Sequence, residues 1–103
     1  MSTIALADDH VLLRKGLASL VQNLGYTVVL ETDNGQELID KLQAGAADPD
    51  LILMDINMPV KDGYEATRWI KENKPLIKVL ALSMYDDENA IMKMLRSGAR
   101  GYI

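Results

Sequence analysis

Apolar and polar residues alternate along this chain in two different rhythms. Short runs of aliphatic and β-branched residues, typical of strands, occupy positions 3–7, 26–30, 51–54, 78–83 and the stretch from 101 onward. Between these runs lie longer segments in which apolar residues recur at the spacing of one helix face. The repeated order of strand and helix predicts one α/β domain, with a parallel sheet between two helical layers.

Single residues indicate where the helices begin and end, and which faces they bury. Gly25 and Gly98 stand where a helix would end in a left-handed cap. Asn34 and Asp86 stand where a helix would begin. The residues expected on the buried faces are Leu13, Leu17, Leu20 and Leu24 in the first helix, Leu38, Ile39 and Leu42 in the second, Ala66, Trp69 and Ile70 in the third, and Ile91, Met94 and Leu95 in the fourth.

The third strand is the centre of the predicted sheet. Residues 51–54 are all apolar and the run ends abruptly at Asp55, as expected of a parallel strand covered on both faces. We therefore expect a doubly wound, flavodoxin-like, three-layer fold with five parallel strands in the order 2-1-3-4-5. The first and third strands then flank the point where the strand order reverses.

Composition narrows the class of protein. The chain has 103 residues, of which 49% are hydrophobic and 25% charged, which is typical of one globular domain. It has no cysteine, which excludes disulfides and thiolate metal sites. No apolar run approaches the ~20 residues of a membrane span, and the N-terminus lacks the pattern of a secretory signal. We therefore expect a cytoplasmic location and no membrane contact.

The balance of charge bears on possible partners. Fifteen acidic residues outweigh eleven basic ones, for a net charge of −4. The basic residues are scattered, with Arg14 and Lys15 the only adjacent pair. Because a clustered cationic face supplies most of the affinity for DNA, we do not expect this segment to bind nucleic acid by itself.

Acidic residues stand at the ends of two strands that should be neighbours. Asp8 and Asp9 end the first strand and Asp55 ends the third, at the edge where such sheets bind ligands. Like charges ~4 Å apart near a surface repel by about 4 kcal/mol, so this group favours a divalent cation. Oxygen ligands favour a hard ion, Mg²⁺ above all. Asp55 is the candidate nucleophile for phosphoryl transfer, and the Ser83 hydroxyl ends the fourth strand.

The same acidic residues also have a plainer interpretation. Asp is common at helix N-caps, and Asp8 or Asp9 alone would be interpreted in that way. The combination of an acidic pair, an isolated Asp and a hydroxyl, each at a strand end, favours a site. His10 is the only histidine, and because it follows the pair in sequence we expect it to open the first helix rather than join the site.

Several segments together resemble a known family. They are Ala-Asp-Asp-His at 7–10, the run 51–59 with its Met-Pro, Asp-Gly at 62–63, Ala-Leu-Ser at 81–83 and Ser-Gly-Ala-Arg-Gly-Tyr at 97–102. The chain resembles the receiver domain of bacterial two-component response regulators over essentially its whole length. It is most similar to the subfamily with a C-terminal, LuxR-type helix-turn-helix.

The resemblance implies a role for each acidic residue. Asp55 would accept a phosphoryl group from a sensor histidine kinase. Asp9 and Asp55 would bind Mg²⁺ directly, together with the backbone carbonyl of Asn57, and Asp8 would hold the ion through water. The domain would regulate an output, which the resemblance implies is transcription. It would not turn over a separate substrate, so it would not be an enzyme in the usual sense.

The resemblance also implies a conformational switch. Ser83 matches the switch hydroxyl and Tyr102 the aromatic that turns inward after phosphorylation. The switched surface could pair with a second receiver to form a homodimer, and DNA would be bound only through an output domain outside this chain. The sequence stops at Ile103, before the lysine and the fifth helix of the family. We therefore expect residues 1–103 to be a receiver domain truncated after strand five.

Three other functions stay open at this point. A haloacid-dehalogenase-like phosphatase also forms an aspartyl phosphate with Mg²⁺, but its nucleophile follows the first strand. A flavodoxin-like nucleotide carrier needs a phosphate-cradling loop where this chain has acidic residues. A receiver-like domain that acts without phosphorylation remains the third alternative, because the lysine is missing.

Overall fold

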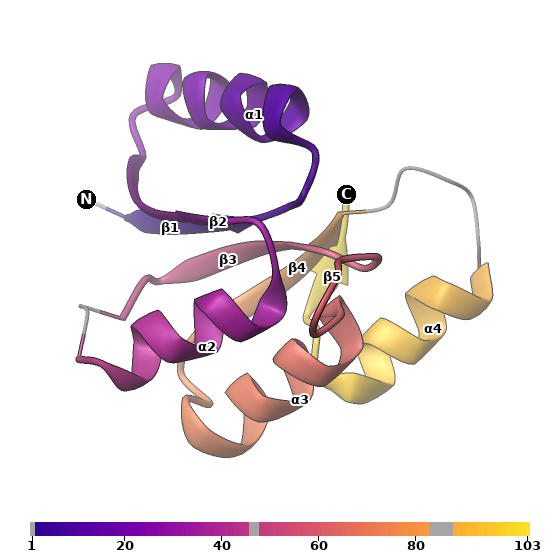
Figure 1. The fold of residues 1–103 in the computed structure, drawn as a ribbon. Helices are drawn as coiled ribbons and strands as arrows, with labels where there is room; N and C mark the ends of the chain where they lie inside the picture. The colour runs from indigo at the N-terminus through magenta and orange to yellow at the C-terminus, as the bar shows by residue number, and fades with distance from the viewer. Residues whose placement is uncertain (1, 46–47, 83–87) are drawn as a thin grey trace.

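The fold is a single five-stranded parallel sheet with helices on both faces (Figure 1). The computed structural model describes residues 2–45, 48–82 and 88–103. The strands are β1 (Thr3–Ala7), β2 (Thr27–Thr32), β3 (Leu51–Asp55), β4 (Lys78–Leu82) and β5 (Gly101–Tyr102). The helices are α1 (Val11–Asn23), α2 (Gly35–Gln43), α3 (Gly63–Asn73) and α4 (Glu88–Ser97).

The strand order is β2-β1-β3-β4-β5, so the predicted fold class and order are confirmed. Figure 1 shows α1 over one face of the sheet and α2, α3 and α4 over the other. The strand β3 pairs with β1 on one side and β4 on the other. Its residues Ile52 and Met54 are fully buried, as expected of a central parallel strand.

The helix ends follow the residues that predicted them. Gly25 has φ +99° and Gly98 φ +125°, a conformation that glycine adopts without steric cost. The Asn34 side chain accepts a hydrogen bond of 2.8 Å from the Glu37 N–H, which satisfies a free donor of the first turn of α2. The predicted cap Asp86 lies outside the described residues.

The buried face predicted for α1 is right only in part, because Leu17 packs against the core and Leu13 is half-buried, but the other two leucines face outward. Leu20 and Leu24 are 54% and 67% exposed, while Ala18 and Val21 are buried against the sheet. The helix is turned by about a quarter turn from the predicted leucine face. This rotation brings Arg14 inward, where its guanidinium donates a hydrogen bond of 2.8 Å to the Asp8 carbonyl. Arg14 therefore lies on the side of α1 that meets the sheet, with Ala18 and Val21.

The buried faces of the other helices largely agree with the prediction. Leu38, Ile39 and Leu42 of α2 are all buried. In α4 the buried residues include Met94, but Leu95 is 36% exposed, contrary to the prediction. The helix α4 packs mainly against α3 rather than on the sheet, so its buried stripe is narrower. Within the described residues, no helix is both long and apolar enough to span a membrane.

Candidate metal centre at the carboxyl edge of the sheet

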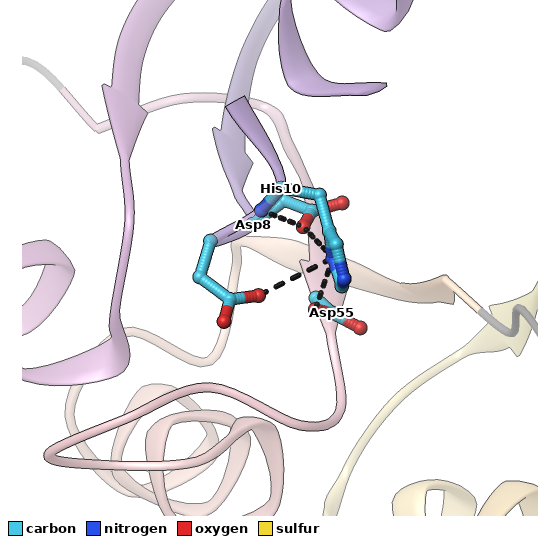
Figure 2. A group of neighbouring side chains, drawn as sticks. Asp8, His10 and Asp55 are labelled. Atoms are coloured by element: carbon cyan, nitrogen blue, oxygen red, sulfur yellow. Dashed lines mark hydrogen bonds and ion pairs between the residues drawn. The ribbon is translucent and has the colours of Figure 1, made fainter. Parts of the chain in front are cut away.

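The topology brings three carboxylates to one edge of the sheet. Asp8 and Asp9 follow the last residue of β1, and Asp55 is the last residue of β3, the neighbouring strand. One oxygen of each carboxylate and one ring nitrogen of His10 lie within 4.8 Å of one another. Figure 2 shows Asp8, His10 and Asp55 pointing toward a common centre. The predicted convergence of the acidic residues is therefore observed.

Asp8 is the most firmly held member of the group. Its side chain is 1% exposed, and its backbone is fixed on both sides. The Asp8 N–H donates to the Thr32 carbonyl at 3.0 Å, and its carbonyl accepts from Arg14 Nη1 at 2.8 Å. Arg14 Nε also lies 3.2 Å from Glu31 Oε1. Charge-assisted hydrogen bonds of this kind are stronger than neutral ones, so the end of β1 is rigidly placed.

Asp55 is buried with one oxygen left without a hydrogen bond. The residue is 5% exposed, and its Oδ1 accepts from the Ile56 N–H at 2.8 Å. Its Oδ2 has no hydrogen-bond partner among the described residues, and His10 Nδ1 lies 3.8 Å away. Buried polar atoms of native proteins are normally satisfied, so this oxygen is suited to binding a cation.

The electrostatics of Asp55 agree with its burial. Loss of solvent is the largest effect and raises the pKa of the Asp55 carboxyl, with the charges of Asp8 and Asp9 adding to it. The Ile56 hydrogen bond works in the opposite direction, and the resulting pKa is about 7. An isolated aspartate titrates near 3.8. A cation beside such a carboxylate would stabilise its charged form.

Gly63 explains why the start of α3 can lie so close to Asp55. A Cβ at this position would overlap the Asp55 backbone carbonyl oxygen. The Gly63 N–H donates to the Ile56 carbonyl at 2.9 Å, which ties the helix to the end of β3. The Asp-Gly pair at 62–63 therefore serves two purposes, because Asp62 also caps α3 by accepting from the Glu65 N–H.

His10 joins the site, and the expectation that it would only open the first helix is wrong. It does form the N-cap position of α1, without a capping hydrogen bond from its side chain. Its ring nitrogen Nδ1 nevertheless lies 3.0 Å from Asp8 Oδ1 and 3.3 Å from Asp9 Oδ1. The hydrogen bond to Asp8, followed by the charges of both aspartates, raises the pKa of His10. The extended backbone of His10 turns the side chain back toward the strand end.

The donor set fits a divalent cation. Three carboxylates offer the oxygen ligands that Mg²⁺ prefers, and Mg²⁺–oxygen bonds of ~2.1 Å place neighbouring ligands about 3.0 Å apart and opposite ones about 4.2 Å apart. The donor atoms here lie within 4.8 Å of one another. The unpartnered Asp55 Oδ2 supplies an open ligand atom.

The remaining predicted site residues are less fully placed. Asn57 follows Asp55 in the loop and is exposed. Tyr102 lies on the edge strand β5 with 57% of its surface exposed. Ser83 lies outside the described residues. The functional roles of these three residues stay predictions.

Comparison with known proteins identifies the family. The response regulator receiver domain family matches residues 4–103, and the chain belongs to this family. The transcriptional regulatory protein LnrK of Bacillus subtilis (strain 168) is 41% identical over 104 residues, covering 100% of this chain and 46% of LnrK. This chain spans about half the length of the curated relatives it matches.

Solved structures agree with that assignment. A LuxR-family two-component response regulator from Aurantimonas sp. SI85-9A1 has a TM-score of 0.89 and 31% identity, covering 99% of this chain and 72% of its own. The BeF3-activated DrrB receiver domain has a TM-score of 0.85 and 27% identity, covering 100% of this chain and 83% of its own. The resemblance drawn from the sequence motifs is therefore confirmed.

Proposed function

We propose that this chain is the phospho-accepting module of a transcriptional response regulator and that Asp55 is its acceptor. The observation that carries the proposal is the Asp55 Oδ2 atom, which is buried, lacks a hydrogen bond among the described residues and lies 3.8 Å from His10 Nδ1 in the acidic group. Asp55 has two carboxylate oxygens, so one can hold the ion while the other attacks phosphorus. The family membership supports a signalling role rather than turnover of a separate substrate.

The chemistry assigned to Asp55 is a simple displacement at phosphorus. A carboxylate oxygen attacks the phosphoryl group of a phosphohistidine, a P–O bond forms, and the P–N bond breaks with its electron pair left on the imidazole. Asp9, Asp55 and the Asn57 carbonyl would hold Mg²⁺ directly, and Asp8 would hold it through water. The ion, when bound, offsets the negative charge of the phosphoryl oxygens.

Phosphorylation of Asp55 would change the conformation of another part of the domain. Ser83 would move toward the phosphoryl group, and the exposed Tyr102 of β5 would turn inward, altering the surface near α4 and β5. We propose a sensor histidine kinase as the donor, a second receiver as a possible partner in a homodimer, and DNA binding through an output domain beyond residue 103. The protein would act in the cytoplasm. Residues 1–103 would be one receiver domain whose fifth helix lies further along the chain.

Phosphorylation from a small-molecule donor tests the proposal without the kinase. The protein is incubated with acetyl phosphate and Mg²⁺, and its intact mass is measured. We expect a gain of one phosphoryl group that disappears with a chelator and in the variant Asp55→Asn. Asp40→Asn is the matched control, because Asp40 is an exposed aspartate of α2. An unchanged mass in the unmodified chain would favour a receiver that acts without phosphorylation.

The phosphatase alternative is separated by a second measurement. A haloacid-dehalogenase-like enzyme would release phosphate from a chromogenic ester over many turnovers. Here the candidate nucleophile is the last residue of β3, and Asn57 rather than an acid stands two residues further on. We expect at most a stoichiometric release, because the site offers no general acid at that position.

A further inference from the structure

We propose that His10 is a nitrogen ligand of the metal centre, in addition to its oxygen ligands, so that the site binds first-row transition ions with an imidazole donor. This inference rests on the metal site of the proposed function and goes beyond it in naming an additional ligand and a preference among ions. The carboxylates explain affinity for a hard cation such as Mg²⁺. The imidazole adds a donor that suits Mn²⁺, Co²⁺ and Ni²⁺ better than Mg²⁺.

The distances around His10 are those of ligands that share one ion. Its Nδ1 lies 3.0 Å from an oxygen of Asp8, 3.3 Å from one of Asp9 and 3.8 Å from one of Asp55. Ligands at ~2.1 Å from a six-coordinate ion are about 3.0 Å apart when adjacent and about 4.2 Å apart when opposite. All three distances fall within that range. The four donor atoms are no more than 4.8 Å apart, so an ion needs to draw them together only by a fraction of an ångström.

A second, independent observation marks the centre of this group as a ligand position. Asp55 Oδ2 is buried and has no hydrogen-bond partner in the described part of the chain. It faces the same ring nitrogen that the other two carboxylates face. Figure 2 shows the His10 ring lying between Asp8 and Asp55 with its nitrogen toward both. The group is therefore more than a set of acidic residues at a surface.

The backbone prepares His10 for this role. Its N–H donates to Asp8 Oδ1 at 2.8 Å, which fixes the residue beside the carboxylates before any ion binds. The ring is 58% exposed, so the outer nitrogen can keep its proton and bond to water. In the tautomer that carries its proton on the outer nitrogen, the inner nitrogen offers its lone pair to an ion in place of its contact with Asp8.

The identity of the ion should matter more for His10 than for the aspartates. Mg²⁺ demands oxygen ligands and keeps several waters. For nitrogen-containing sites the affinity rises from Mn²⁺ to Ni²⁺. Loss of the imidazole should therefore weaken Ni²⁺ binding most, Mn²⁺ binding less and Mg²⁺ binding least. A residue that only packs beside the site would show no such gradient.

Pulsed electron paramagnetic resonance of the Mn²⁺-loaded chain tests the ligand directly. His10 is the only histidine in the sequence, so in protein prepared without a histidine tag any imidazole nitrogen coupling to Mn²⁺ comes from this residue. We expect that coupling in the unmodified chain and none in His10→Phe, which keeps a ring but has no donor. Absence of the coupling in the unmodified chain, with Mn²⁺ bound, overturns the proposal.

Binding titrations with Mg²⁺, Mn²⁺ and Ni²⁺ give a second readout. In His10→Phe we expect Ni²⁺ affinity to fall by about tenfold or more, with a smaller loss for Mn²⁺ and the smallest for Mg²⁺. His10→Asn should show the same order, which guards against a fold defect specific to the aromatic variant. A uniform gain of affinity for all three ions contradicts the proposal, because it would mean that the ring competes with the metal for the carboxylates.

The two proposals fail in different ways. If Mg²⁺ supports phosphorylation of Asp55 but Mn²⁺ shows no nitrogen coupling, the ligand role of His10 is refuted and the phospho-acceptor function stands. If Mn²⁺ shows the coupling but Asp55 takes no phosphoryl group, the metal centre and its histidine ligand stand and the proposed function is refuted.

Discussion

Replacing Asp55 with asparagine should stabilise the metal-free protein at neutral pH. The folded structure raises the pKa of Asp55 from 3.8 to about 7, so the folded state holds a proton that the unfolded chain releases near pH 4. By proton linkage, stability is fully present below the unfolded pKa and is lost as the pH rises through the folded one. An asparagine removes the buried charge while keeping the shape of the side chain.

The magnitude follows from the size of the shift. A difference of roughly three pKa units corresponds to at most about 4 kcal/mol. The site lies at the surface edge of the sheet, where Asp9 and His10 are substantially exposed, so solvent screens much of the effect. We expect Asp55→Asn to raise the free energy of unfolding by about 1–2 kcal/mol above pH 7, and by progressively less as the pH falls toward 4.

Urea unfolding with a chelator present measures the effect. The unmodified protein, Asp55→Asn and the control Asp40→Asn are compared at about pH 5 and about pH 8. We expect the gain in free energy of unfolding over the unmodified protein to grow with pH for Asp55→Asn and to stay near zero for Asp40→Asn. Added Mg²⁺ should stabilise the unmodified protein more than Asp55→Asn, since it then offsets the same charge. If Asp55→Asn is no more stable than the unmodified protein at the higher pH, the negative charge of Asp55 does not destabilise the folded state as its burial implies.

Three further substitutions test the local structure around the site, each by urea unfolding. Val60 has φ +67° and is 80% exposed; Val60→Gly should stabilise by about 1 kcal/mol because a β-branched residue is strained there, and a loss of stability would contradict this. Gly63→Ala should destabilise by about 2 kcal/mol or more, since its Cβ meets the Asp55 carbonyl; a neutral effect would show that α3 can move away. Asn34→Ala should cost about 1 kcal/mol through the lost N-cap, whereas an unchanged midpoint would mean that water replaces the cap.

Much of the fold could be predicted because it follows from periodicity and from the ends of strands. The apolar run of β3 and its abrupt end at Asp55 placed that strand at the centre of the sheet, and the parallel topology then brought Asp8 and Asp9 to it. Strand order and converging carboxylates are consequences of the chain's overall pattern. They do not depend on the exact rotation of any helix.

The errors arose at polar residues that the apolar pattern does not describe. In α1, Arg14 lies on the buried side and reaches the Asp8 carbonyl and Glu31, whereas the leucine pattern left it out of the buried face. His10 was misplaced for a related reason, because sequence order says nothing about where a side chain at a helix N-cap points. The one available signal in the sequence was that the only histidine follows the acidic pair, and the structure places its ring beside both carboxylates.

The most direct test of the central claim is to locate the phosphoryl group chemically. Protein treated with acetyl phosphate and Mg²⁺ is reduced with borohydride, which marks an aspartyl phosphate permanently, and its peptides are mapped by mass spectrometry. The account predicts that the mark falls on Asp55 and that a chelator abolishes it. A mark on a different carboxylate, or one that forms equally well without a divalent ion, would contradict it.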